Sequence, residues 1–120
     1  ALMGASHIKH CSEFEPAARI LSIVVSTPEP NLAIIDAGRK TAGSDSGMPI
    51  IQNIPGATVK GLSAEHGSIV LPNINVNIGD KIWVVPWDIS ETMNLHDYIQ
   101  VIREGYLEAV WDIPARGTYL

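Results

Sequence analysis

The apolar residues of this chain are divided into short runs, each about the length of a β-strand. The longest runs, 20–25 and 82–86, are rich in Ile and Val, whose branched side chains favour a pleated strand over a helix. Pro, Gly and Asn separate the runs and are typical of turns. A membrane-spanning helix needs about 18 consecutive apolar residues, and no run approaches that length. The sequence therefore predicts a soluble chain built from strands.

Eight strands can be assigned from these runs and from stretches in which apolar and polar residues alternate. The last two form a closing hairpin around the turn at 104–105, and helical turns are expected only at 13–18 and 91–96. The sequence thus predicts an all-β fold, a small barrel or sandwich of about seven or eight short strands with at most one or two helical turns. The expected strands are 18–27, 32–36, 57–62, 67–71, 73–77, 81–86, 98–103 and 106–113.

Length, charge and cysteine content narrow the class of protein. The 120 residues fit a single domain. The formal net charge is −5, and the 8 Lys and Arg residues are scattered, so a nucleic-acid partner is not expected. The one cysteine, Cys11, cannot close an intramolecular disulfide, which suits a reducing compartment and predicts a cytoplasmic protein.

Two segments, 35–45 and 86–97, contain most of the polar groups that could carry chemistry. Each follows an apolar run, so the end of a strand can hold these groups rigidly beside a cleft. In the first segment, Gly38 and the carboxylates of Asp36 and Asp45 are expected mainly to order a long surface loop. The second segment offers the richer set of candidate site residues.

Five short motifs occur in one order along the chain: VSTP at 25–28, DAG-x-K at 36–40 with Asp45, SAEHG at 63–67, GDKIWVVP at 79–86 and TMNLHD at 92–97. In this order they resemble the C-terminal domain of the D-threonine aldolase and D-serine dehydratase family, across residues 18–117. The resemblance implies that residues 1–120 are one β-domain of a fold-type III lyase. In such enzymes a TIM-type barrel carries pyridoxal phosphate on a lysine, and the β-domain closes over the cofactor, usually that of the partner subunit.

The barrel itself is not in this sequence. Such a barrel takes about 250 residues, and the chain has 120. Its lysines stand in no recognisable cofactor context, so pyridoxal phosphate is expected only in a complete enzyme, and the chain alone is not expected to be active. The expected partners are a barrel domain or subunit, a D-amino-acid substrate and a second copy in a homo-oligomer. The lysines are Lys9, Lys40, Lys60 and Lys81.

The resemblance also implies a metal site, but this chain departs from it. Dehydratases of the family have His-x-Cys after the strand that ends in proline, and aldolases have His-x-Asp; this chain has Asp88 and Ser90. A serine hydroxyl is a poor metal ligand and a lone carboxylate binds weakly, which makes a divalent metal doubtful. Asp88 could still contact a hard cation. Alternatively, Asp88 and Ser90 cap the helical turn at 91–96.

Four further residues are candidates for catalysis. Glu65 and His66 place an imidazole beside a carboxylate, a pairing suited to proton transfer, and the resemblance puts the matching segment near the cofactor cleft. A solvated histidine on a loop is the alternative. Asn94 and His96 could line the same cleft or satisfy backbone groups where the chain leaves a turn.

Two functions follow as expectations. The first is a lid and dimerisation domain of a pyridoxal-phosphate D-amino-acid aldolase or dehydratase, which contributes rim residues to an active site completed by a barrel. The second is a non-catalytic β-domain for assembly or small-ligand binding, with an eroded metal site.

Overall fold

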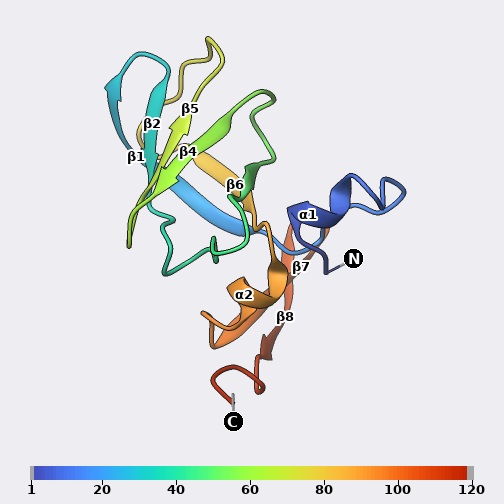
Figure 1. Cartoon of the computed structure of the whole chain (residues 1–120). Coiled ribbons are helices and arrows are strands. Elements are labelled where there is room, and N and C mark those ends of the chain that lie inside the picture. Colours follow the sequence, from blue (N-terminus) through green and yellow to red (C-terminus); the bar gives the residue numbers. More distant parts are fainter. Residues whose placement is uncertain (1, 119–120) are drawn as a thin grey trace.

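The computed structural model describes residues 2–118, which form eight strands and two short helices (Figure 1). Almost all regular structure is therefore β, as the short apolar runs predict. The elements are α1 (Ala5–Ile8), β1 (Ile20–Glu29), β2 (Leu32–Ile35), β3 (Ile50–Ile51), β4 (Thr58–Leu62), β5 (Gly67–Val70), β6 (Lys81–Val85), α2 (Ile89–Met93), β7 (Tyr98–Arg103) and β8 (Tyr106–Asp112).

Six strands wrap into a nearly closed antiparallel barrel, in the order β3-β6-β1-β2-β5-β4. The two edge strands, β3 and β4, lie against each other, which brings the sheet round on itself (Figure 1). The long strand β1 pairs with β6 from Ile20 to Ile23 and with β2 from Val24 to Glu29. Register shifts in the second half let β1 bend between its two partners. The prediction of a small all-β barrel is confirmed.

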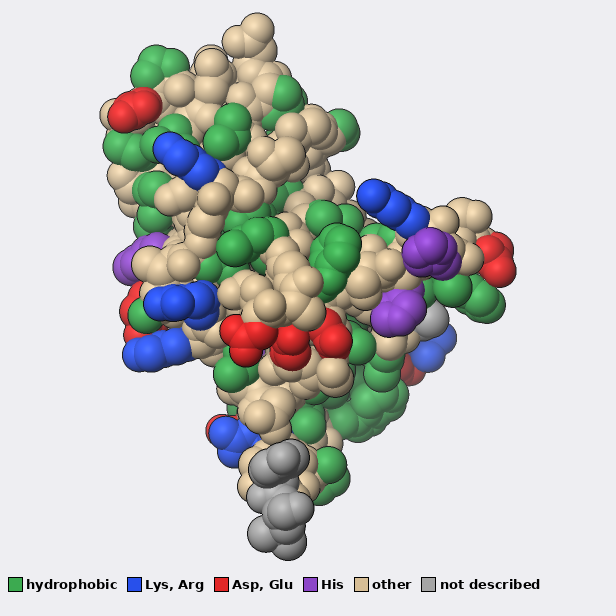
Figure 2. Space-filling view, viewed as in Figure 1, with side chains coloured by type: hydrophobic (Ala, Val, Ile, Leu, Met, Phe, Trp, Pro, Cys, Tyr) green, Lys and Arg blue, Asp and Glu red, His purple; other side chains and the backbone are tan. Residues whose placement is uncertain are grey.

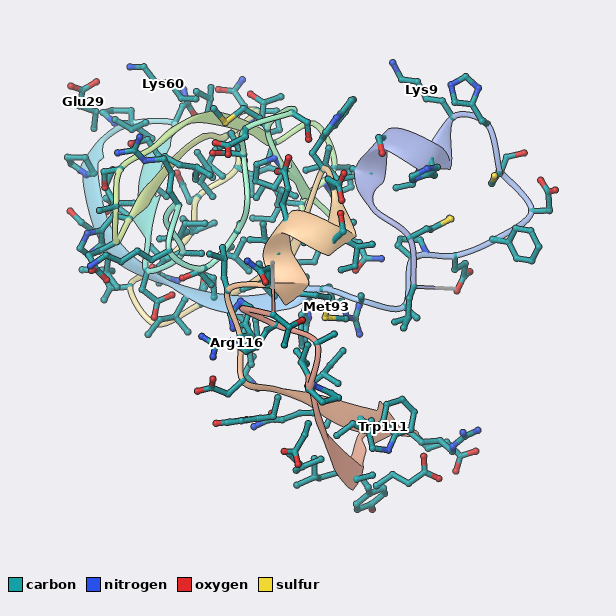
Figure 3. The ribbon with its side chains drawn as sticks, turned by 60° about the horizontal axis from the view of Figure 1, so that its bottom comes forward. Lys9, Glu29, Lys60, Met93, Trp111 and Arg116 are labelled. Carbon is teal, nitrogen blue, oxygen red and sulfur yellow. The ribbon has the colours of Figure 1, made fainter. Side chains whose placement is uncertain are left out.

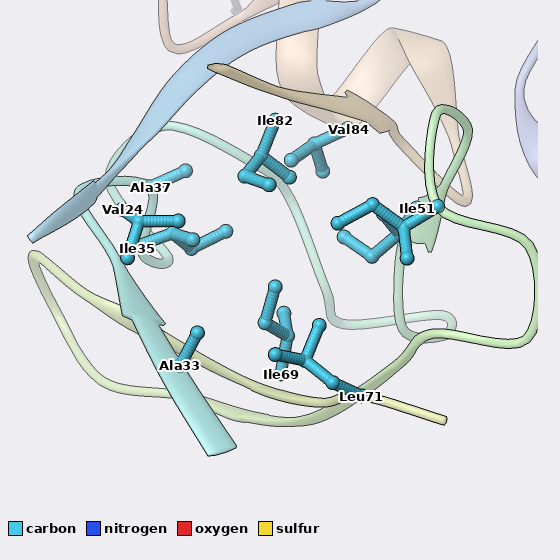
Figure 4. Packing of buried hydrophobic residues seen from close by; sticks show 10 residues of the cluster. Val24, Ala33, Ile35, Ala37, Ile51, Ile69, Leu71, Ile82 and Val84 are labelled. Carbon is cyan, nitrogen blue, oxygen red and sulfur yellow. The ribbon is translucent and has the colours of Figure 1, made fainter. Parts of the chain in front are cut away.

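The core of the barrel is filled by aliphatic side chains that alternate along the strands (Figure 4). Ala33 and Ile35 of β2 point inward and are completely buried, as are Ile69 of β5 and Ile82 of β6. Because alternate residues of a strand point to opposite faces, the same period leaves the intervening positions on the outside. The core thus depends on the β-branched residues that identified the strands in the sequence.

Strands β7 and β8 pair only with each other and form a separate two-stranded sheet. The hairpin is where the sequence predicts it, but it does not close the barrel. It extends away from the barrel (Figures 1 and 3), and Trp111 of β8 pairs with Ile99 of β7 near the open end of the hairpin. Large apolar side chains on this hairpin are exposed: Tyr98, Ile102, Tyr106, Leu107, Val110 and Trp111.

Three local predictions are wrong. Residues 73–77 form no strand, because Asn73 has a φ of 53° and turns the chain away from an extended course. Residues 13–18 form no helix, since Pro16 lacks the N–H that a helix would use there. The short apolar stretch at Ile50 and Ile51, expected to be part of a surface loop, is strand β3 and pairs with β6.

The N-terminal helix α1 lies against the chain that follows β6. Ala5 N donates a 2.7 Å hydrogen bond to Pro86 O, and Ser6 N donates a 3.2 Å bond to Trp87 O. A Cβ atom at Gly4 would lie 2.2 Å from Trp87 O, so glycine is required for this approach. Within the described residues, no helix has the length and apolarity needed to cross a bilayer.

Candidate functional site at one end of the barrel

The rim loop, which we define as residues 36–45, begins directly after β2 and is fixed at its first residue. The Asp36 carboxylate accepts a 2.6 Å hydrogen bond from Ser22 Oγ and a 2.9 Å bond from Ile23 N. Burial of the carboxyl raises its pKa, but these hydrogen bonds outweigh burial and the net pKa of Asp36 is lowered. Asp36 therefore orders the start of the rim loop, as the sequence predicts, by accepting hydrogen bonds from β1.

The rim loop next runs beside the β4–β5 turn, residues 63–66. Arg39 N donates a 2.8 Å hydrogen bond to Ser63 O, and Lys40 N donates a 3.0 Å bond to Ala64 O. A Cβ atom at Gly38 would lie 2.5 Å from both Ala64 O and His66 N, so only glycine allows this contact. Two motifs that are distant in the sequence are thereby held together.

Glu65 pairs with Lys40 across this contact. Lys40 Nζ lies 2.5 Å from Glu65 Oε1, and this hydrogen bond and positive charge lower the pKa of the Glu65 carboxyl. Both side chains are well exposed, so the pair contributes little to stability. The His66 side chain is also exposed, while its backbone N–H donates to Ser63 Oγ at 3.2 Å.

The far end of the rim loop is attached to α2 and to the residues after it. Gly43 N donates a 3.1 Å hydrogen bond to Thr92 Oγ1, and His96 Nε2 lies 2.8 Å from Thr41 O. A carbonyl oxygen has no proton to give, so Nε2 of His96 is the protonated nitrogen. The Asn94 side chain accepts a 3.0 Å bond from Gly117 N. Asn94 and His96 thus do satisfy backbone groups, as the second sequence interpretation predicts.

Asp88 is the N-cap of α2. Its Oδ1 accepts hydrogen bonds from Ser90 N at 2.7 Å and from Ser90 Oγ at 2.5 Å, and these bonds lower the pKa of the carboxyl. The arrangement is the one that the capping interpretation predicts. It does not fit a divalent metal, since the carboxylate is engaged by the serine, and residues 2–118 contain no group of three His, Cys, Asp or Glu side chains arranged for one.

The six candidate residues do not form one hydrogen-bonded cluster. Figure 1 shows the rim loop between the end of β4 and β5 on one side and α2 on the other. Among the described residues, the only hydrogen bonds through a side chain that join two of the six are those between Asp88 and Ser90, and one backbone bond joins Asn94 N to Ser90 O. The others, Glu65, His66, Asn94 and His96, each contact the rim loop, the β4–β5 turn or the C-terminal segment.

A pocket of about 260 Å³ lies between the rim loop and α2. Figure 2 shows acidic side chains gathered where these two elements meet. Sequence analysis names two residues of its lining, Asp45 and Asn94, but not the pocket itself, because the pocket depends on contact between segments about fifty residues apart. A larger, open hollow of about 450 Å³ lies between residues 27–32 and 71–77, remote from the candidate residues. The smaller pocket is lined by Arg39, Gly43, Ser44, Asp45, Glu91, Asn94 and Leu95.

The described residues do not form a site for pyridoxal phosphate. All four lysines are exposed, and Lys40 is paired with Glu65. Figure 3 shows Lys9 and Lys60 extending outward from the molecule. A Schiff-base lysine must instead face a pocket that holds the cofactor.

The fold and much of the sequence are shared with known aldolases. The chain is 38% identical to a D-threonine aldolase from Arthrobacter over 106 residues, which cover 87% of this chain and 28% of that enzyme. The crystal structure of D-threonine aldolase from Filomicrobium marinum matches with a TM-score of 0.83 and 35% identity, over 89% of this chain and 30% of that chain. The chain thus spans less than a third of the length of these aldolases.

One relative matches this chain over most of its own length, unlike the aldolases. An uncharacterised protein from Mycobacterium tuberculosis is 27% identical over 118 residues, and the match covers 89% of both proteins. That protein is therefore similar in size to this chain.

A family match covers most of the barrel and the rim. Residues 17–102 match the family described as "Putative serine dehydratase domain". These residues include all six barrel strands, the rim loop, α2 and most of β7. The chain belongs to this serine dehydratase domain family.

Proposed function

We propose that this chain is the small β-domain of a pyridoxal-phosphate-dependent lyase that acts on a D-amino acid, as an aldolase resembling D-threonine aldolase or as a dehydratase. A barrel on other polypeptide holds the cofactor, and the β-domain contributes residues around the rim loop. The observation that carries the proposal is that hydrogen bonds attach this loop at two places. Lys40 N bonds to the β4–β5 turn, which contains His66, and Thr41 O bonds to the His96 ring. Aldolases with 35–38% identity to this chain support the reaction class.

The length of the relatives supports a separate barrel. More than two thirds of the Arthrobacter aldolase lies outside the matched region, which leaves room for a barrel of about 250 residues. The exposed lysines of this chain are in keeping with the same division, because the cofactor needs an enclosed one. The β-domain therefore acts as a lid over a reaction centre that it does not itself contain.

The hairpin β7–β8 supplies a surface for this assembly. A two-stranded sheet on its own is marginally stable in water. Both faces of this hairpin carry exposed apolar side chains, and Trp111 is 57% exposed, so the hairpin has apolar surface that a second domain can cover. Figure 2 shows apolar side chains gathered over this hairpin. We propose that the hairpin packs on the barrel domain and that the assembled enzyme is a homo-oligomer. Because Cys11 is free, a cytoplasmic location belongs to the same proposal.

Within the assembled enzyme, the exposed imidazole of His66 is the proposed proton-transfer group. Its turn is fixed by the backbone bonds of Arg39 and Lys40, so the ring is presented from a rigid support. Glu65 and His96 are proposed to complete the rim, with Asn94 beside them. Asp88 and Ser90 remain helix-capping residues in this proposal, and no step is assigned to a metal there.

Two experiments test the proposal. The coding sequence upstream of Ala1 is expected to encode a barrel with a lysine-bearing strand. In that complete enzyme, His66→Ala is expected to lower kcat for D-threonine cleavage about a hundredfold or more at an unchanged melting temperature, whereas His10→Ala leaves kcat unchanged. An unaltered rate in the His66 variant would remove the catalytic role.

A second function is favoured by the mycobacterial relative of similar size. In this alternative the β-domain exists without a barrel and serves assembly or small-ligand binding. An upstream sequence without a barrel, together with a purified protein that takes up no pyridoxal phosphate, would favour it over the lyase proposal.

A further inference from the structure

The pocket between the rim loop and α2 contains charges of both signs that do not pair with one another. Arg39 lines one part of it, and Asp45 and Glu91 line others. Within residues 2–118, none of these three side chains belongs to an ion pair with N···O of 4.0 Å or less. Arg39 and Asp45 are exposed, so in the free chain their charges are solvated and remain available to a ligand. The arrangement leaves space for a molecule that carries both charges.

Glu91 gives an independent indication of a missing partner. Its Oε2 atom is sealed from solvent and has no hydrogen-bond partner among the described residues. It is held there because Gly43 packs directly on the Glu91 side chain, where a Cβ atom would lie 2.4 Å from Glu91 Cβ. A half-buried carboxylate without a donor is costly, and a cationic group on its remaining oxygen would offset that cost.

The neutral groups of the pocket suit a polar ligand. The Ser44 hydroxyl and the Asn94 amide nitrogen are not used in any hydrogen bond within residues 2–118, although Asn94 Oδ1 is engaged by Gly117 N. Both can bind a carboxylate beside Arg39, and Leu95 offers an apolar contact. Donors and acceptors are thus present for each end of a zwitterion.

The volume sets the size of the ligand. About 260 Å³ is the space of roughly nine water molecules and is smaller than pockets that hold drug-sized molecules. A bare divalent cation fits less well, because Arg39 adds positive charge and residues 2–118 contain no three-residue metal group. A small amino acid meets both the size and the charge pattern.

We propose that this pocket binds a small α-amino acid in its zwitterionic form, with the ammonium group toward Glu91 and Asp45 and the carboxylate toward Arg39. The site is formed by this chain alone, so it extends the proposed function without needing a barrel.

Titration of the 120-residue chain, followed by amide NMR, tests the proposal. Glycine and D-threonine are expected to give saturable shifts at Gly43, Ser44 and Asn94. Ethanolamine lacks the carboxylate and lactate lacks the ammonium group, so each is expected to bind at least about tenfold more weakly. Magnesium chloride at matched ionic strength is the cation control.

Substitutions identify the two charged ends. Arg39→Ala and Glu91→Gln are each expected to weaken D-threonine binding at least about tenfold, while Glu29→Gln, at the other end of the barrel, leaves it unchanged. Asp45→Asn is a second test of the ammonium end at an exposed position, should Glu91→Gln disturb the fold.

Three outcomes would overturn the amino-acid site. They are an absence of shifts well above millimolar concentration, equal affinity for the single-charge analogues, and tighter binding of magnesium. None of these would bear on the lyase proposal, which is tested by turnover of the complete enzyme.

Discussion

The buried hydroxyl of Ser22 donates a 2.6 Å hydrogen bond to the carboxylate of Asp36. Ser22 lies in β1 and is only 2% exposed, whereas Asp36 is the first residue of the rim loop. The bond therefore fixes the origin of the loop to the central strand of the barrel. The Ser22–Asp36 bond therefore determines where the rim loop starts relative to the barrel.

Asp36 should make stability depend on pH. Its folded-state pKa is lowered, so the stabilisation is present above the ordinary carboxyl pKa and is lost as the pH falls through the lowered value. We expect the free energy of unfolding to fall below about pH 4, and Asp36→Asn to lose about 1 kcal/mol at neutral pH and show a smaller acid dependence. Urea denaturation at several pH values measures both, with Asp112→Asn as the control.

An equal acid dependence in the Asp36→Asn variant and the parent chain would contradict this account. The other carboxyls with lowered pKa, Glu65 and Asp88, would then carry the whole effect.

Gly38 and Gly61 form a matched pair of substitutions. At Gly38 a Cβ atom would lie 2.5 Å from two backbone atoms of the β4–β5 turn, while at Gly61 it would meet nothing within 4 Å. We expect Gly38→Ala to lower the free energy of unfolding by about 2 kcal/mol, and Gly61→Ala to change it by no more than about 0.5 kcal/mol. Thermal or urea denaturation checks the difference, and equal effects would show that the turn yields freely.

Capping by Asp88 predicts a specific order among its variants. Asp88→Ala removes the acceptor for Ser90 N and is expected to cost about 1 kcal/mol, whereas Asp88→Asn keeps an acceptor and costs less. Denaturation of the two variants side by side gives the order. Indistinguishable variants would mean that the cap contributes nothing to stability.

The metal question can be settled by elemental analysis of protein purified without chelators. Because a serine hydroxyl is a poor zinc ligand and Ser90 Oγ donates to Asp88 Oδ1, we expect the parent chain to contain zinc well below one equivalent. The double variant Asp88→His with Ser90→Cys places an imidazole and a thiolate, both good zinc ligands, at these positions and is expected to retain more zinc. Stoichiometric zinc in the parent chain would reverse our interpretation of this turn.

The hairpin and the barrel should differ in their contributions to stability. Ile35 is completely buried in the core, while Leu107 on β8 is 59% exposed. We expect Ile35→Ala to cost about 3 kcal/mol and Leu107→Ala to cost no more than about 0.5 kcal/mol in the isolated chain. Amide hydrogen exchange should be faster in β7 and β8 than in β1, β2 and β5. A large loss in the Leu107 variant would mean that the hairpin belongs to the folded core.

The sequence predicts the barrel strands well because each carries its own signal. β1 and β2 are dense in β-branched residues, and Pro30 and Asn31 mark the turn between them. The alternation at 73–77 is an equally regular pattern, but Asn73 turns the chain there and no strand forms. Periodicity reports which side chains are apolar and not whether a neighbouring strand is available for pairing.

The site shows the same limit. Asp88 as a cap follows from the residue type and its place before a short helix, so local sequence suffices. The attachment of Thr41 to His96 and the pocket beneath Gly43 join segments about fifty residues apart. Such contacts are set by tertiary packing, and no local sequence pattern predicts them.

The bond between His96 and Thr41 has a consequence for any chemistry at the rim. With Nε2–H committed to a carbonyl, the ring keeps a single free lone pair, on Nδ1, and cannot rotate without breaking its tether. A hydrogen-bond donor can therefore approach the His96 ring only at Nδ1, from the side opposite Thr41.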